Sequence, residues 1–162
     1  MREDLADSIC IDTHHKLRSS IAADEMVMAY HFSDYEMAEA RIPSVITMDN
    51  SVSTLSAANG RMYHALILLA TAKTRKWSRL RKVKKFLKQM RKWSKFCPKN
   101  YLGRQLLVEA EMARVQKRFE RAYSKFYLAI VQFLDAGYLL LEALANERAR
   151  KFCASIEKRD KA

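Results

Sequence analysis

Glu109, Glu111 and Glu142 are the carboxylates of this sequence that invite a catalytic interpretation. Two such groups that face one substrate could serve as general acid and general base. Glu109 and Glu111 are two residues apart, so on a helix they point in different directions. No nucleophile or metal ligand stands at a useful spacing from any of the three. We therefore expect solvated or ion-paired glutamates, and we predict no catalytic residue and no enzymatic activity for this chain.

The histidines and cysteines do not form a metal site. His14 and His15 are adjacent and cannot face the same side of a helix, while His31 and His64 lie beside aromatic residues and are expected to pack. The three cysteines stand more than fifty residues apart without a CxxC pair: Cys10, Cys97 and Cys153. We therefore predict no metal, no cofactor and no disulfide framework. A reduced, intracellular chain is expected.

Glycine and proline are scarce. The three glycines stand far apart, which excludes a phosphate-binding loop or a dinucleotide fingerprint. With only two prolines in addition, the 162 residues lack the turn signals that β-rich folds need. The sequence therefore predicts one all-α domain, and its 18.8 kDa suffices to bury a core.

Basic residues gather in the middle of the chain. The sequence has 30 Lys and Arg against 18 Asp and Glu, a net charge of +12. Residues 73–99 hold thirteen basic residues and no acid, whereas residues 1–72 hold five basic and ten acidic ones. The middle segment alone thus exceeds the net charge of the whole chain. Such a segment favours an anion-rich partner.

The basic segment predicts an amphipathic helix over 79–95 with Ser78 as its N-cap. Its apolar stripe follows helical spacing: Leu80, Val83, Phe86, Leu87, Met90 and Trp93. The opposite face holds the candidate contacts to an anionic partner: Arg81, Lys82, Lys84, Lys85, Lys88, Arg91, Lys92 and Lys95.

Two interpretations of this helix remain open. If the apolar stripe is free, the helix has the pattern of a calmodulin target or of a membrane-surface helix. If the stripe packs into the core, only the Lys and Arg face is available. Trp77, Phe86, Met90 and Trp93 could stack on bases, but at helical spacing we favour a core role.

Periodicity and turn signals predict about seven helices in all. The other six are expected near 17–32, 35–42, 55–72, 101–115, 119–136 and 138–157, with Pro43 closing or kinking the second. The predicted organisation is a weakly structured segment (1–16), a helical-repeat domain (17–158) and a tail (159–162). The N-terminus is acidic and the longest apolar run has six residues, so neither a signal peptide nor a membrane span is expected, and we predict a cytoplasmic location.

Two helix starts are alike. Tyr35-Glu36-Met37-Ala38 and Phe119-Glu120-Arg121-Ala122 lie 84 residues apart, about two helix hairpins, which indicates an array. The surroundings of the second start are close to a tetratricopeptide (TPR) unit, in which small residues let paired helices approach. The residues expected to pack this unit are Leu106, Ala110, Ala113, Phe119, Ala122, Phe126 and Ala129. We therefore predict antiparallel hairpins stacked as a TPR-like α-solenoid.

Four longer blocks carry a family resemblance. They are YHFSDYEMA (30–38), MYHALILLATA (62–72), KWSKFCPKNYLGRQLLVEAEMARV (92–115) and GYLLLEALANERARKF (137–152). They resemble the helical-repeat region of very large signalling ATPases, over most of residues 20–155. In that family a kinase-like domain and an AAA-type NTPase domain precede the repeats, and a GAF module with a histidine-kinase or nucleotide-cyclase domain follows them.

The resemblance implies a non-catalytic scaffold or sensor segment that contacts other proteins or neighbouring domains of the same polypeptide. The chain departs from the family in its acid-free segment 73–99 and in the joint 116–118, which lacks the usual glycine. It also stops after the seventh expected helix, so we expect a piece of a longer protein, or a decayed or partial gene product, with four uncovered side chains: Leu140, Leu141, Leu144 and Phe152.

The alternative function is an anion-binding module that uses the helix 79–95. An acidic lipid or an acidic calmodulin-like protein would be its partner, and nucleic acid is the less favoured choice.

Overall fold

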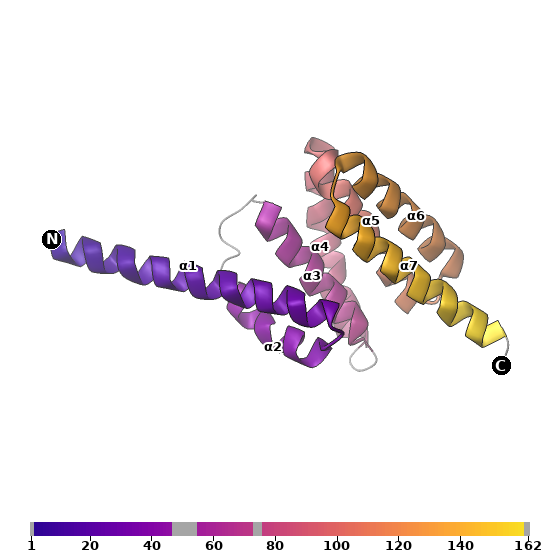
Figure 1. The fold of residues 1–162 in the computed structure, drawn as a ribbon, viewed down its shortest axis with the longest axis horizontal. Coiled ribbons are helices and arrows are strands. Elements are labelled where there is room, and N and C mark those ends of the chain that lie inside the picture. Colours follow the sequence, from indigo (N-terminus) through magenta and orange to yellow (C-terminus); the bar gives the residue numbers. More distant parts are fainter. Residues whose placement is uncertain (1, 47–54, 73–75, 161–162) are drawn as a thin grey trace. The chain divides into compact units, whose positions relative to one another are not determined.

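All regular secondary structure in the described residues is helical. The computed structural model describes residues 2–46, 55–72 and 76–160, and these contain seven helices and no strand (Figure 1). The helices are α1 (Arg2–His31), α2 (Tyr35–Ile46), α3 (Leu55–Ala70), α4 (Lys76–Phe96), α5 (Pro98–Val115), α6 (Phe119–Ala136) and α7 (Leu139–Asp160). This confirms the predicted all-α class and helix number for that part of the chain.

The chain divides into two compact units. The N-terminal unit comprises Met1–Ile67 and the C-terminal unit comprises Leu68–Ala162, with the boundary inside α3. The predicted organisation into one repeat domain over 17–158 stays a prediction.

The N-terminal unit is built on the hairpin of α1 and α2, which pack against each other. Asp34 caps α2, because its Oδ1 accepts a hydrogen bond of 3.0 Å from the backbone N–H of Met37. Ser19 on α1 donates a hydrogen bond of 2.8 Å to the backbone carbonyl of Ser44 near the end of α2. This contact ties down the last turn, so α2 continues to Ile46 past Pro43 rather than ending at residue 42.

Helix α1 begins earlier than the sequence indicated. It starts at Arg2, whereas residues 1–16 were expected to be weakly structured and the helix to begin near residue 17. The sequence contains neither glycine nor proline before Pro43, so nothing in it interrupts the helix. As Figure 1 shows, α1 extends well beyond the end of α2.

The C-terminal unit is a series of packed neighbours: α4 on α5, α5 on α6 and α6 on α7. Six of the seven predicted packing residues are buried in it: Leu106, Ala110, Ala113, Ala122, Phe126 and Ala129. Phe119 is half-buried, and its ring centroid lies 6.1 Å from that of Phe152 on α7. At Gly103, α5 comes close to α6, because an added Cβ would lie 2.8 Å from ring atoms of Phe133.

The expectation that α7 leaves an apolar face uncovered is wrong for three of the four residues. Leu141, Leu144 and Phe152 are buried, and the Phe152 ring centroid lies 5.6 Å from that of Phe126 on α6. These side chains are covered because α7 folds back on α6. Leu140 alone of the four is exposed, by 67%.

The hairpins α1–α2 and α5–α6 have the same turn at a displacement of 84 residues. Ser33 and Lys117 each take a left-handed conformation there, with φ of 63° and 60°. The same four backbone hydrogen bonds close both turns, and in the first they join Phe32 to Met28, Ser33 to Tyr30, Asp34 to Ala29 and Ala38 to Asp34. The internal repeat indicated by two similar helix starts thus extends to backbone geometry, and Lys117 occupies the conformation usually reserved for glycine.

Candidate functional site

Helix α4 carries the predicted basic face and begins three residues before the expected range 79–95. It starts at Lys76, so Ser78 lies within the helix and is not its N-cap. Arg79 falls on the apolar side of this helix, where its Nη1 donates a hydrogen bond of 2.6 Å to Thr71 Oγ1. This contact gives one nitrogen of the Arg79 guanidinium a polar partner on the apolar side of the helix.

The apolar stripe of α4 is occupied by packing. Four of its residues are buried: Leu80, Val83, Leu87 and Met90. Phe86 and Trp93 are half-buried, and the Trp93 ring centroid lies 5.4 Å from that of Tyr101 on α5. Trp77 is 84% exposed, so the core role predicted for it is wrong. The calmodulin-target pattern requires a free stripe, which folded α4 does not offer.

The opposite face of α4 is open to solvent. Seven of the eight predicted anion contacts are exposed and have no ion pair recorded within the described residues: Arg81, Lys82, Lys84, Lys85, Lys88, Lys92 and Lys95. The eighth, Arg91, is half exposed but is held by an acid. The face therefore presents seven exposed cations beside one that is ion-paired.

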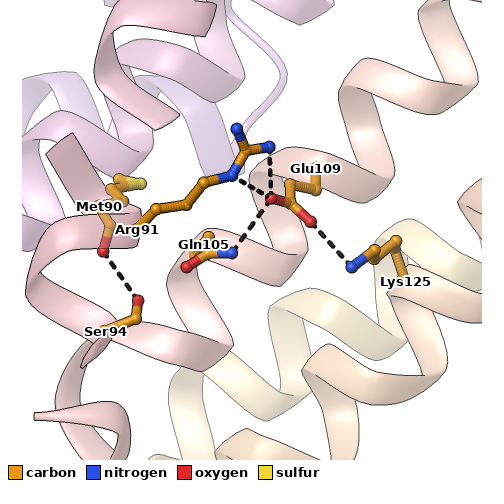
Figure 2. Close-up of polar contacts among 6 residues, drawn as sticks. All are labelled: Met90, Arg91, Ser94, Gln105, Glu109 and Lys125. Atoms are coloured by element: carbon orange, nitrogen blue, oxygen red, sulfur yellow. Dashed lines mark hydrogen bonds and ion pairs between the residues drawn. The ribbon is translucent and has the colours of Figure 1, made fainter. Parts of the chain in front are cut away.

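Arg91 binds the buried carboxylate of Glu109 on α5 (Figure 2). Its Nε and Nη2 donate hydrogen bonds of 3.0 and 2.8 Å to Glu109 Oε1, which also accepts one of 3.1 Å from Gln105. On the other side, Lys125 Nζ on α6 lies 2.9 Å from Glu109 Oε2. One carboxylate thus joins three successive helices, as Figure 2 shows.

The surroundings of Glu109 set its pKa. Burial opposes ionisation and acts to raise the pKa, since the side chain is only 4% exposed. Hydrogen bonds from Lys125 and Arg91, together with the positive charge of Lys125, outweigh this effect and hold the pKa below its ordinary value of 4.5. Glu109 is therefore a fixed structural anion rather than a proton donor at neutral pH.

Glu111 lies on a different side of α5 and binds two arginines. Arg148 Nε on α7 and Arg114 Nε each donate a hydrogen bond of 2.6 Å to it, through Oε1 and Oε2 respectively. The sequence predicted solvated or ion-paired glutamates, and both Glu109 and Glu111 are ion-paired. Neither glutamate faces solvent.

The ion pair between Glu109 and Lys125 has a counterpart in the first hairpin, and the sequence contains a signal for it beyond the two similar helix starts. At the same displacement of 84 residues, Glu25 corresponds to Glu109 and Arg41 to Lys125. Arg41 Nε lies 2.9 Å from Glu25 Oε2, so both hairpins have the same cross-helix ion pair. The equal spacing of Glu25 and Glu109 before the two turns is the sequence signal that predicts this ion pair.

His31 packs in the N-terminal unit as expected. Its Nε2 is 2.9 Å from the hydroxyl of Tyr63, and its ring also meets that of Tyr30 at a centroid distance of 6.1 Å. Among the residues that the structure describes, no group of three or more His, Cys, Asp or Glu side chains could hold a metal ion. The described helices also include none with the length and apolar character needed to cross a membrane.

Comparisons with known proteins add no relative. No protein-family model matches the chain, and searches of curated proteins and of solved structures found no match.

Proposed function

We propose that this chain is a non-catalytic helical-repeat module that mediates protein–protein contacts, built from antiparallel hairpins as a TPR-like α-solenoid. It serves as a scaffold or sensor segment of a multidomain signalling ATPase or kinase of the kind that its sequence blocks resemble, in the cytoplasm. Its partners are other proteins or neighbouring domains of the same polypeptide.

The hairpin repeated after 84 residues is the observation that carries this proposal. Backbone turn, left-handed residue and cross-helix ion pair all recur at one displacement. Repeated helix pairs present extended surfaces for other proteins. Large apolar side chains are also exposed on several helices, among them Tyr127 on α6 and Leu140 on α7.

Crosslinking in the cells that make the protein tests the proposal. A photoreactive amino acid at position 127 or 140 should give a discrete covalent adduct with another protein or with a neighbouring domain. The same amino acid in place of exposed Lys151 is the control for random collision. No adduct at either test position, or ATP turnover by the purified chain, would contradict the proposal.

The open basic face of α4 favours a second candidate, an anion-rich partner. About seven phosphate contacts would give a log–log salt slope near −6 on duplex DNA and near −5 on a single strand. Replacing Arg81, Lys84 and Lys88 with Gln should weaken this binding, make the salt slope shallower and leave helicity intact. Arg91 is left unchanged, because it holds Glu109. A flat salt response would exclude the nucleic-acid form of this candidate.

A further inference from the structure

The α5–α6 hairpin shows what covers one face of this repeat. Helix α4 packs on α5, with the Trp93 ring near Tyr101 and Arg91 on Glu109. Counted back by 84 residues, Tyr101 and Glu109 correspond to Leu17 and Glu25 on α1. The face of α1 that corresponds to the α4-binding face of α5 therefore contains Leu17 and Glu25.

That face of α1 is open and apolar. Leu17, Ile21 and Met28 are each at least half exposed, and Phe32 is more so. A groove of about 490 Å³ lies between α1 and α2. Its large apolar lining residues are Ile21, Met28 and Phe32 of α1 and Met37 of α2. The Glu25 side chain is 39% exposed, against 4% for Glu109 under α4. Glu109 is less exposed than Glu25 because α4 covers it.

The groove is also acidic. Asp24, Glu25 and Asp34 line it, and the N-terminal unit holds ten acidic and five basic residues. Arg41 binds Glu25 through Oε2, as Lys125 binds Glu109. In the second hairpin the other oxygen, Oε1, accepts the arginine of the covering helix. A helix that covers α1 would accordingly be basic and would bring its own arginine to Glu25.

We propose that the groove between α1 and α2 binds a basic amphipathic helix of a partner protein, seated as α4 is seated on α5. Bulky apolar side chains of that helix lie against Ile21, Met28 and Phe32, and one arginine reaches Glu25. This inference rests on the proposed function and names the chemistry of one partner. A second copy of the chain is disfavoured as occupant, because the apolar stripe of its own α4 is buried.

A synthetic peptide with the sequence of residues 76–96 is a suitable probe, because it has the required pattern. Fluorescence anisotropy of the labelled peptide with the full chain should show saturable binding. Met28→Lys should weaken it roughly tenfold or more, since it places a charge among the apolar contacts and against a basic ligand. Tyr123→Lys, an equally exposed substitution on α6, should leave it unchanged. Circular dichroism checks that both variants keep the native fold.

A double-mutant cycle tests the seat of the arginine. Arg91→Gln in the peptide should weaken binding to the native chain but have little further effect on the Glu25→Gln chain. Binding that survives Met28→Lys, or equal binding of a scrambled peptide, would overturn the inference. So would a dimer of the chain that Met28→Lys dissociates. Crosslinks at positions 127 and 140 without peptide binding would reject the groove alone and leave the proposed function in place.

Discussion

Single residues decide how the helices of the C-terminal unit are joined, and Glu109 is the clearest case. Its carboxylate accepts hydrogen bonds or ion pairs from α4, α5 and α6. A buried anion that loses its partners costs several kcal/mol, whereas a fully partnered one stabilises a defined arrangement. The sequence placed Glu109 beside a second acid, and only the packing shows that the two serve different helix pairs.

Replacing Glu109 with Gln should change how stability depends on pH. The native pKa is lowered, so ionised Glu109 adds stability above its ordinary pKa, and this contribution is lost as pH falls through the native pKa. The Gln variant should be roughly 1–3 kcal/mol less stable at neutral pH. The difference from the native chain should then shrink in acid, as measured by urea unfolding at several pH values. Glu142→Gln on α7 is the control, and an equal pH response in both variants would contradict the assignment.

Lys117 is strained by its left-handed backbone. The left-handed conformation costs a residue with a side chain roughly 1–2 kcal/mol. Glycine avoids this cost but gives up about 0.5–1 kcal/mol, because its backbone loses more conformational entropy on folding. Lys117→Gly should therefore stabilise the chain by about 0.5–1 kcal/mol in thermal unfolding. Gly137→Ala, at φ 75°, should act in the opposite direction. A loss of stability in Lys117→Gly would mean that the lysine side chain has a role of its own.

At the scale of elements, α4 depends on its packing and not on its own sequence for stability. Its cations are spaced three and four residues apart, an arrangement that destabilises a helix by repulsion. Leu87→Ala or Met90→Ala should cost roughly 2–5 kcal/mol, because both side chains are buried. Trp77→Ala on the same helix should stay within about 0.5 kcal/mol. Chemical denaturation of the three variants measures this, and equal losses would place Trp77 in the core after all.

Helix α6 shows how far sequence patterns reach, because its predicted range of 119–136 matches the observed one. Gly137 ends this helix in the left-handed conformation. A glycine at a helix end is a local signal, so the sequence alone can predict the end of α6. Helix α5 begins at Pro98, three residues before the expected residue 101, because proline suits a first helical position. Arg148 on Glu111 and the cover over Phe152 come from residues distant in the sequence, which no local pattern reveals.

At the scale of the whole molecule, charge is divided unevenly. Residues 1–67 hold five basic and ten acidic groups, and residues 68–162 hold twenty-five and eight. The chain thus combines an acidic unit with a strongly basic one.

Added salt should stabilise the chain. Repulsion among the exposed cations of α4 is screened within about 10 Å at 0.1 M salt, whereas the buried pairs of Glu109 and Glu111 are screened less. The melting temperature should therefore rise by several degrees between 20 and 300 mM NaCl. Replacing Lys84 and Lys88 with Gln should flatten this rise. A falling melting temperature would mean that exposed ion pairs outweigh the repulsion.

The close approach at Gly103 also distinguishes the pairing within the second hairpin from a pairing between the two hairpins. Duplicated hairpins in one chain risk misfolding by swapped pairing. The position that corresponds to Gly103 in the first hairpin is Ser19, which donates its hydroxyl to the carbonyl of Ser44. If α6 paired with α1, the ring of Phe133 would meet a side chain where it now rests on bare backbone, and Ser19 would lose its acceptor. A swapped pairing of α6 with α1 would therefore lose both the close contact at Gly103 and the hydrogen bond of Ser19.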